Sequence, residues 1–205
     1  MINKKVIDKY DINNMYDSLL LFADQIKFAL EKKNDISTPK IDSIDSIVIC
    51  GMGGSAIGGE LFKALLSNKI SIPIFVIKDY LLPKYINKNS FVIISSYSGN
   101  TEESLSLFHQ TLKISNQFFI VASGGELIDL AIKNKINYIK IKSGIQPRAT
   151  LGYSFMYLIL ILNQLKLIDN NIINEIQSIV SDLNQLIKIY SNYNLGNSNL
   201  AIQYS

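Results

Sequence analysis

The sequence predicts an α/β protein built around a mostly parallel sheet of five strands, with helices on both faces. Short runs of β-branched and aromatic residues, each the length of a buried strand, recur along the chain. Longer segments with helical spacing of apolar residues separate these runs. Strands that alternate with helices in this way form a parallel sheet that is covered on both sides.

The N-terminal part of the chain predicts one helix followed by a connection. Apolar residues recur at helical spacing between Asp11 and Lys33, which is typical of an amphipathic helix. The segment from Asp35 to Asp45 contains Pro39 and shows no such spacing. We therefore expect it to lead into the sheet as a loop.

The middle of the chain supplies the strands and the helices between them. The five expected strands are Ile47–Cys50, Ile72–Ile77, Phe91–Ile94, Phe118–Val121 and Tyr138–Ile141. Helices are expected after Ser55, after Thr101 and at Glu126–Lys133, with a loop at Pro83–Asn89. Ser55 and Thr101 are both residue types that cap helix N-termini.

The C-terminal part is helical and begins with an unusually apolar segment. Leu151–Leu162 is nearly all apolar, but it is too short to cross a bilayer, which takes about 20 residues. We expect a helix that is buried in the core or in an interface. Ile172–Tyr190 has amphipathic helical spacing, whereas Tyr193–Ser205 shows no evident pattern.

Composition and charge exclude several classes of protein. With 205 residues, 48% of them hydrophobic, the chain can bury one globular core. Its net charge of +3 comes from scattered lysines, which leave no basic stripe for nucleic acid. The single cysteine, Cys50, excludes an internal disulfide, and the first residues show no apolar leader. We expect a cytoplasmic protein that binds neither nucleic acid nor membrane.

A glycine-rich turn follows the first expected strand. Five of the chain's eleven glycines lie between Gly51 and Gly59, where a helix N-terminus can attract an anion. Gly51, Gly53 and Ala56 match the dinucleotide-binding pattern G-x-G-x-x-A, and Asp79 lies where a ribose-binding acid would be. The Gly-Lys-Ser/Thr ending of a P-loop is absent, so we do not expect an ATPase. A tight turn without any ligand is the alternative.

A second polar turn, Ser95–Glu103, follows the third expected strand and opens a helix. Ser96, Ser98 and Thr101 can each donate a hydrogen bond to a phosphate oxygen. Turns at the carboxyl ends of neighbouring parallel strands converge on one crevice. A dinucleotide site does not need such a loop, so the two turns together favour a phosphorylated ligand. An ordinary cluster of capping residues is the alternative.

Three ordered motifs resemble those of a known family. The sequence Ser-Tyr-Ser-Gly-Asn-Thr-Glu-Glu, which starts at Ser96, is similar to the phosphosugar-binding loop of SIS (sugar isomerase) domains. Gly-Met-Gly-Gly-Ser-Ala-Ile-Gly-Gly from Gly51, and Gln-Pro-Arg-Ala-Thr-Leu-Gly-Tyr from Gln146, narrow the resemblance. Together they resemble the bifunctional phosphoglucose/phosphomannose isomerases, over nearly the whole chain.

The resemblance implies a fold and an activity. The fold is a SIS-type three-layer sandwich, with an N-terminal helix in residues 1–36, the SIS domain in 37–165, and a linking helix in 166–205. The activity is the interconversion of glucose 6-phosphate or mannose 6-phosphate with fructose 6-phosphate through a cis-enediolate. We expect a homodimer that needs no cofactor and no metal.

The resemblance also assigns roles to individual residues. Ser96, Ser98 and Thr101 would bind the substrate phosphate, and Gly53, Gly54 and Ser55 would form a substrate-binding turn. Arg148, the only arginine in the sequence, would be catalytic and would stabilise the enediolate oxyanion. A guanidinium keeps its charge, which suits an oxyanion that forms only in the transition state. A surface ion pair is the alternative for this arginine.

Members of the family carry a second SIS domain, which supplies a glutamate base, a ring-opening histidine and a lysine. Here Asn197 to Tyr204 resembles the lead into that domain, and nothing follows it in the sequence. His109 matches no family motif, so we expect it on a solvated helix face, and we give Glu102 and Glu103 no catalytic role. The chain thus resembles the phosphate-binding half of the enzyme. A non-catalytic sugar-phosphate-binding module and a nucleotide-binding Rossmann domain are the alternatives.

Overall fold

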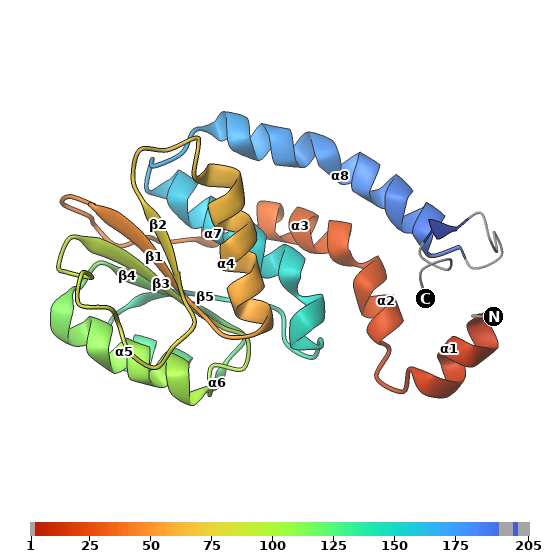
Figure 1. Cartoon of the computed structure of the whole chain (residues 1–205), viewed down its shortest axis with the longest axis horizontal. Coiled ribbons are helices and arrows are strands. Elements are labelled where there is room, and N and C mark those ends of the chain that lie inside the picture. Colours follow the sequence, from red (N-terminus) through yellow and green to blue (C-terminus); the bar gives the residue numbers. More distant parts are fainter. Residues whose placement is uncertain (1–2, 193–198, 201–205) are drawn as a thin grey trace.

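Five parallel strands form one sheet in the order β2-β1-β3-β4-β5 (Figure 1). The structure is a computed structural model that describes residues 3–192 and 199–200. The strands are β1 Ser46–Cys50, β2 Ile74–Ile77, β3 Ser90–Ser96, β4 Phe118–Ala122 and β5 Asn137–Lys140. In the centre of the sheet, Ile47 of β1 is opposite Ile74 of β2 and Phe91 of β3. The expected fold class and all five expected strands are confirmed.

Eight α-helices in the described residues accompany the sheet. They are α1 Lys4–Tyr10, α2 Met15–Leu20, α3 Phe22–Glu31, α4 Gly54–Leu66, α5 Glu102–Ile114, α6 Gly125–Lys133, α7 Leu151–Gln164 and α8 Asn170–Tyr190. Two single 3₁₀ turns, η1 Lys33–Asp35 and η2 Pro147–Ala149, precede the sheet and α7. The expected lead at Asn197–Tyr204 lies almost entirely outside the described residues.

The N-terminal segment corrects the sequence prediction of one helix from Asp11 to Lys33. It forms two helices, α2 and α3, and α1 precedes them. The Asp11 carboxylate accepts hydrogen bonds from the N–H groups of Met15 and Tyr16, at 2.8 and 2.7 Å. Asp11 therefore lies before α2 rather than inside a helix, and Ile12 beside it is 85% exposed. Only α3 buries an apolar face, formed by Ala23, Ile26 and Ala29.

Side chains of the central strands alternate between two apolar layers. Ile47 and Ile49 of β1 point to the layer that contains α3, α4, α7 and α8. Val48 and Cys50 point to the opposite layer, which contains α5 and α6. This period of two buries both faces of the sheet, as parallel strands require.

Helix α7 lies in the middle of the first layer, against α3 and α4 (Figure 1). Every residue from Met156 to Leu162 is buried, so the expectation that this apolar segment is a buried helix is confirmed. No helix among the described residues is long and apolar enough to span a membrane.

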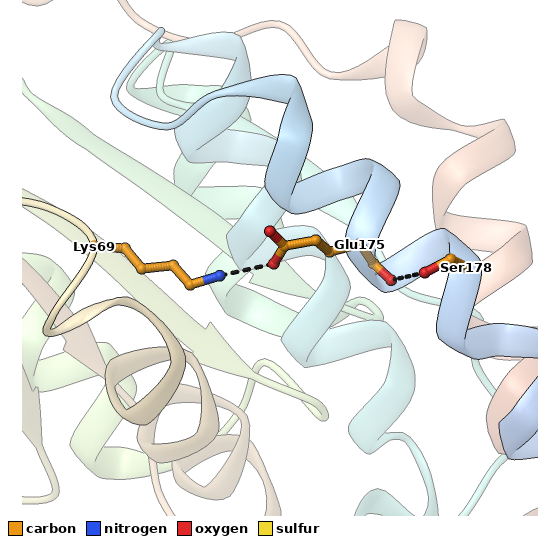
Figure 2. A network of polar contacts seen from close by, with 3 residues as sticks. All are labelled: Lys69, Glu175 and Ser178. Carbon is orange, nitrogen blue, oxygen red and sulfur yellow. Dashed lines mark hydrogen bonds and ion pairs between the residues drawn. The ribbon is translucent and has the colours of Figure 1, made fainter.

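Helix α8 runs along the outside of α3 and is linked to the end of α4. The Lys69 ammonium forms an ion pair with the Glu175 carboxylate at 2.7 Å, and the Glu175 carbonyl accepts a hydrogen bond from the Ser178 hydroxyl (Figure 2). Both charged side chains are partly exposed, so the pair contributes at most about 1 kcal/mol. Burial of Ile172, Ile173, Ile176 and Val180 is therefore the main attachment of α8.

Candidate functional site

The two glycine-containing turns meet at the carboxyl ends of β1 and β3, as the sequence predicts. The backbone N–H of Tyr97 donates a hydrogen bond to the Ser55 hydroxyl at 3.2 Å and so joins the turns directly. A pocket of about 100 Å³ lies between them. Its lining combines residues of all three motifs: Met52, Gly54, Ser55, Ser96, Tyr97, Ser98, Thr101 and Pro147.

The first turn differs from the prediction in how α4 begins. Gly53 occupies the N-cap position with a φ of 51°, a conformation that favours glycine. Ser55 lies inside α4 and does not cap it, because its hydroxyl accepts the hydrogen bond from Tyr97 instead. A Cβ on Gly54 would lie 3.1 Å from the Pro147 carbonyl oxygen. The missing side chain of Gly54 therefore allows η2 to lie directly against the start of α4.

The second turn brings three hydroxyl groups together. The hydroxyls of Ser96 and Thr101 lie 3.2 Å apart, and that of Thr101 lies 2.6 Å from the hydroxyl of Ser104. Thr101 occupies the N-cap position of α5 as expected, but its side chain bonds these serines rather than a helix N–H. The first N–H groups of a helix have no partner within the helix. The N-terminus of α5 thus adds donors and a positive dipole end to this turn.

The second turn has a fixed shape because the turn after β4 packs against it. Gly99 has a φ of 70°, and a Cβ there would overlap the Gly124 carbonyl group. The Gly99 carbonyl accepts a hydrogen bond from the Leu127 N–H at 2.9 Å, and the Asn100 side chain accepts one from the Glu126 N–H at 2.8 Å. The N–H of Asn100 donates to the Ser98 hydroxyl at 3.2 Å. Contacts with the turn after β4 therefore hold the backbone that carries these hydroxyls.

Arg148 lies in η2, one residue after the pocket-lining Pro147, and is exposed. None of the ion pairs found among residues 3–192 and 199–200 involves it. The alternative interpretation, a surface ion pair, thus has no support in this part of the chain. The Arg148 backbone is thus next to a residue that lines the pocket, and its side chain is exposed.

Several other residues considered in the sequence lie outside the pocket. Cys50 is fully buried, and this burial raises the pKa of its thiol to about 12, which makes it unreactive. His109 is exposed on α5, as expected. The Asp79 carboxylate is exposed and accepts a hydrogen bond from the Tyr80 N–H at 2.6 Å. The Tyr80 hydroxyl donates to Glu103, which raises the pKa of Tyr80.

Two residues that support the site were missed in the sequence. Gln25 is buried at the contact between α3 and α7, and Tyr97 connects the second turn to the loop before η2. Gln25 is a polar residue beside the apolar stripe of a helix, which is a signal for a buried polar contact. Tyr97 lies inside the second motif, where the sequence prediction included only the serine and threonine hydroxyls.

Within the described residues, no cluster of His, Cys, Asp and Glu could hold a metal ion.

Comparison with known proteins yields several relatives. A bifunctional phosphoglucose/phosphomannose isomerase of Caldicellulosiruptor bescii is 41% identical over 177 residues, which cover 85% of this chain and 52% of that protein. Its counterpart in Thermoplasma acidophilum is 36% identical over 138 residues, or 67% of this chain and 42% of that protein. The chain therefore resembles the bifunctional phosphoglucose/phosphomannose isomerase family. It spans about half the length of the curated relatives it matches.

The family has relatives with another activity. A D-glucosamine-6-phosphate 4-epimerase of Sulfolobus acidocaldarius is 31% identical to this chain over 127 residues, which cover 62% of the chain and 40% of the epimerase. No protein-family model matches the sequence. The similarity of this chain to these isomerases therefore rests on individual relatives.

Solved structures share the fold of this chain. The C-terminal domain of glucosamine-fructose-6-phosphate aminotransferase from Francisella tularensis superimposes with a TM-score of 0.65 at 12% identity, over 90% of this chain and 57% of that one. Tagatose-6-phosphate ketose/aldose isomerase from Escherichia coli gives a TM-score of 0.57 at 12% identity, over 90% and 52%. These likenesses show the SIS fold that the motifs imply.

Proposed function

We propose that this chain is the phosphate-binding half of an aldose–ketose isomerase. The enzyme would interconvert glucose 6-phosphate or mannose 6-phosphate with fructose 6-phosphate, in the cytoplasm and as a homodimer. The observation that carries the proposal is the convergence of the three motifs on one pocket lined by hydroxyl groups. The relatives support it, since the names of those compared above all refer to phosphorylated hexoses.

The phosphate would bind at the second turn. The hydroxyls of Ser96, Ser98 and Thr101 can donate to its oxygens, together with N–H groups at the N-terminus of α5. The pocket of about 100 Å³ is far smaller than the roughly 300–1,000 Å³ of sites that enclose a whole small ligand. It therefore suits a phosphoryl group, with the sugar extending past the Gly53–Ser55 turn toward η2. A dinucleotide would need more enclosed space.

Arg148 would act on the other end of the sugar. Isomerisation removes the proton on C2 of the aldose, moves charge onto the oxygens of C1 and C2, and returns the proton to C1. The planar guanidinium of Arg148 can bind the oxyanion that develops on the enediolate. No carboxylate or imidazole lines the pocket among the described residues, so the base would come from outside this part of the chain.

Calorimetry with fructose 6-phosphate tests the binding site. The double variant Ser98→Ala/Thr101→Ala removes two donors to a charged group, each contributing about 1.5–3 kcal/mol. Binding should weaken at least a hundredfold, whereas Ser106→Ala, on the outer side of α5, should bind as the wild type does. Unchanged affinity in the double variant would contradict the assignment. NAD, offered in the same experiment, should not bind.

The lack of a base in the pocket lining also favours a second candidate, a non-catalytic sugar-phosphate-binding module. A coupled isomerase assay separates the two. The chain alone should turn over fructose 6-phosphate negligibly, since general-base help contributes about 10²–10⁴-fold. Addition of the second half of a family member, fused or in trans, should restore turnover. Binding that is never accompanied by restored turnover would favour the module.

A further inference from the structure

Gln25 of helix α3 holds the backbone that follows Arg148 in the sequence. Its side-chain amide donates a hydrogen bond to the Ala149 carbonyl at 2.6 Å, and its side-chain carbonyl accepts one from the Gly152 N–H at 3.0 Å. The side chain is 1% exposed, so both bonds are shielded from water. A Cβ on Gly152 would lie 2.9 Å from Gln25, so glycine is what allows this approach.

Tyr97 holds the backbone that precedes Arg148 in the sequence. Its hydroxyl accepts a hydrogen bond from the Ile145 N–H at 2.9 Å and donates one to the Lys142 carbonyl at 3.1 Å. Its own carbonyl accepts hydrogen bonds from the N–H and the hydroxyl of Ser123, at 2.9 and 2.6 Å. Through Tyr97, the loop that leads into η2 is attached to the second turn.

We propose that Gln25 and Tyr97 are positioning residues that hold the Arg148 backbone at a set distance from the second turn. This inference rests on the proposed function. The η2 turn is only three residues long, and one turn of 3₁₀ helix has too few internal bonds to fix its own place. The Arg148 side chain is exposed, so its reach is set by the backbone that carries it. Hydrogen bonds before and after Arg148 supply this support.

Two probes separate the phosphate site from Arg148. Inorganic phosphate reports the second turn alone. 5-Phospho-D-arabinonate, whose carboxylate takes the place of the C1–C2 enediolate, reports the second turn and Arg148 together. Tyr97→Phe should weaken 5-phosphoarabinonate binding about fivefold, the equivalent of one hydrogen bond of about 1 kcal/mol. It should weaken phosphate binding less than 5-phosphoarabinonate binding, because the hydroxyl that it removes bonds Ile145 and Lys142 rather than the second turn.

Tyr16→Phe is the matched control. It removes a hydroxyl that donates to the Ser191 carbonyl at 2.6 Å, far from the pocket lining, and should change neither affinity. In an Arg148→Ala background, Tyr97→Phe should cause no further loss, because its effect passes through the arginine. An additive loss there, or an equal loss of phosphate binding, would overturn the proposal.

Amide hydrogen exchange tests the same proposal without a ligand. The Ala149 N–H donates to the Gln146 carbonyl at 2.8 Å, so its exchange rate reports opening of η2. Tyr97→Phe and Gln25→Met should each raise this rate about fivefold, and Tyr16→Phe should not. An unchanged rate in Tyr97→Phe overturns the proposal, even if Gln25→Met does not fold. If the wild type binds neither probe, the proposed function fails separately, because exchange still tests the support of η2.

Discussion

Ser104 should control phosphate binding although it does not line the pocket. It is 2% exposed, and its hydroxyl donates to the Thr101 carbonyl at 2.9 Å and lies 2.6 Å from the Thr101 hydroxyl. The Thr101 carbonyl also accepts the Leu105 N–H at 3.1 Å. Ser104 can therefore turn its proton to the Thr101 hydroxyl without leaving that carbonyl unpaired. The proton of Thr101 then becomes available to a phosphate oxygen.

The magnitude follows from this one contact. Ser104→Ala removes the hydroxyl that orients the Thr101 hydroxyl. A hydrogen bond in a series that leads from Ser104 through Thr101 to the charged phosphate contributes about 1–2 kcal/mol. The dissociation constant for fructose 6-phosphate should therefore rise about 5- to 30-fold. Alanine has a higher helix propensity than serine, so α5 itself should still form.

Calorimetry with fructose 6-phosphate is the assay, and Ser106→Ala is the control. Ser106 lies on the same helix, but its hydroxyl donates to the Tyr80 carbonyl at 2.9 Å, away from the pocket. The control variant should bind within twofold of the wild type. The reasoning would be refuted if Ser104→Ala bound as tightly as the wild type, or if Ser106→Ala lost as much affinity.

Three further predictions concern other parts of the site and the fold. Gly54→Ala places a Cβ 3.1 Å from the backbone of η2 and should weaken fructose 6-phosphate binding. Gly124→Ala, whose Cβ meets open space, should not weaken it. Equal affinities of the two variants in calorimetry would contradict this prediction. Hydrogen bonds from Asn87 and Ser46 lower the pKa of Asp45 below its ordinary value of 3.8, so its charged form stabilises the fold above that value. Asp45→Asn should therefore unfold at lower urea concentration at pH 7, and the difference from wild type should vanish as the pH falls through the lowered pKa; a pH-independent difference would be evidence against this. In an isomerase restored with the second half, Arg148→Lys should lower kcat more than it raises KM, because a point charge replaces a planar fork; steady-state kinetics that show only a raised KM would count against an oxyanion role.

The strands and the meeting of the two turns could be predicted because each depends on local pattern. The β-branched runs fix the strands, and parallel topology brings their carboxyl ends to one edge. The start of α2 at Met15 could not be predicted, because the Asp11 carboxylate forms a cap where the apolar spacing suggests that the helix has already begun. Local propensity identifies Asp11 as a good cap only when the start of the helix is known.

Tertiary contacts explain what was missed at the site. Ser55 has a capping side chain, but its hydroxyl pairs with an N–H 42 residues away in the sequence. Gln25 binds backbone groups that are 124 and 127 residues away. The short windows of sequence from which helices and caps are predicted do not contain both partners of these bonds. The residues that would touch the ligand are therefore easier to find than those that support them.

The burial of α7 has a consequence for how the chain folds during synthesis. One face of the sheet is covered by α3, α4 and α7, yet α7 is made after all five strands. At about 5–20 residues per second, the ribosome needs roughly 6 to 25 seconds to pass from Gln25 to the carbonyl that it binds, 124 residues later. In the part of this interval that follows the synthesis of β3, the apolar side of β1 and β3 lacks its central cover. A nascent chain halted before residue 151 should therefore be a substrate for holding chaperones, and one halted beyond α8 should not.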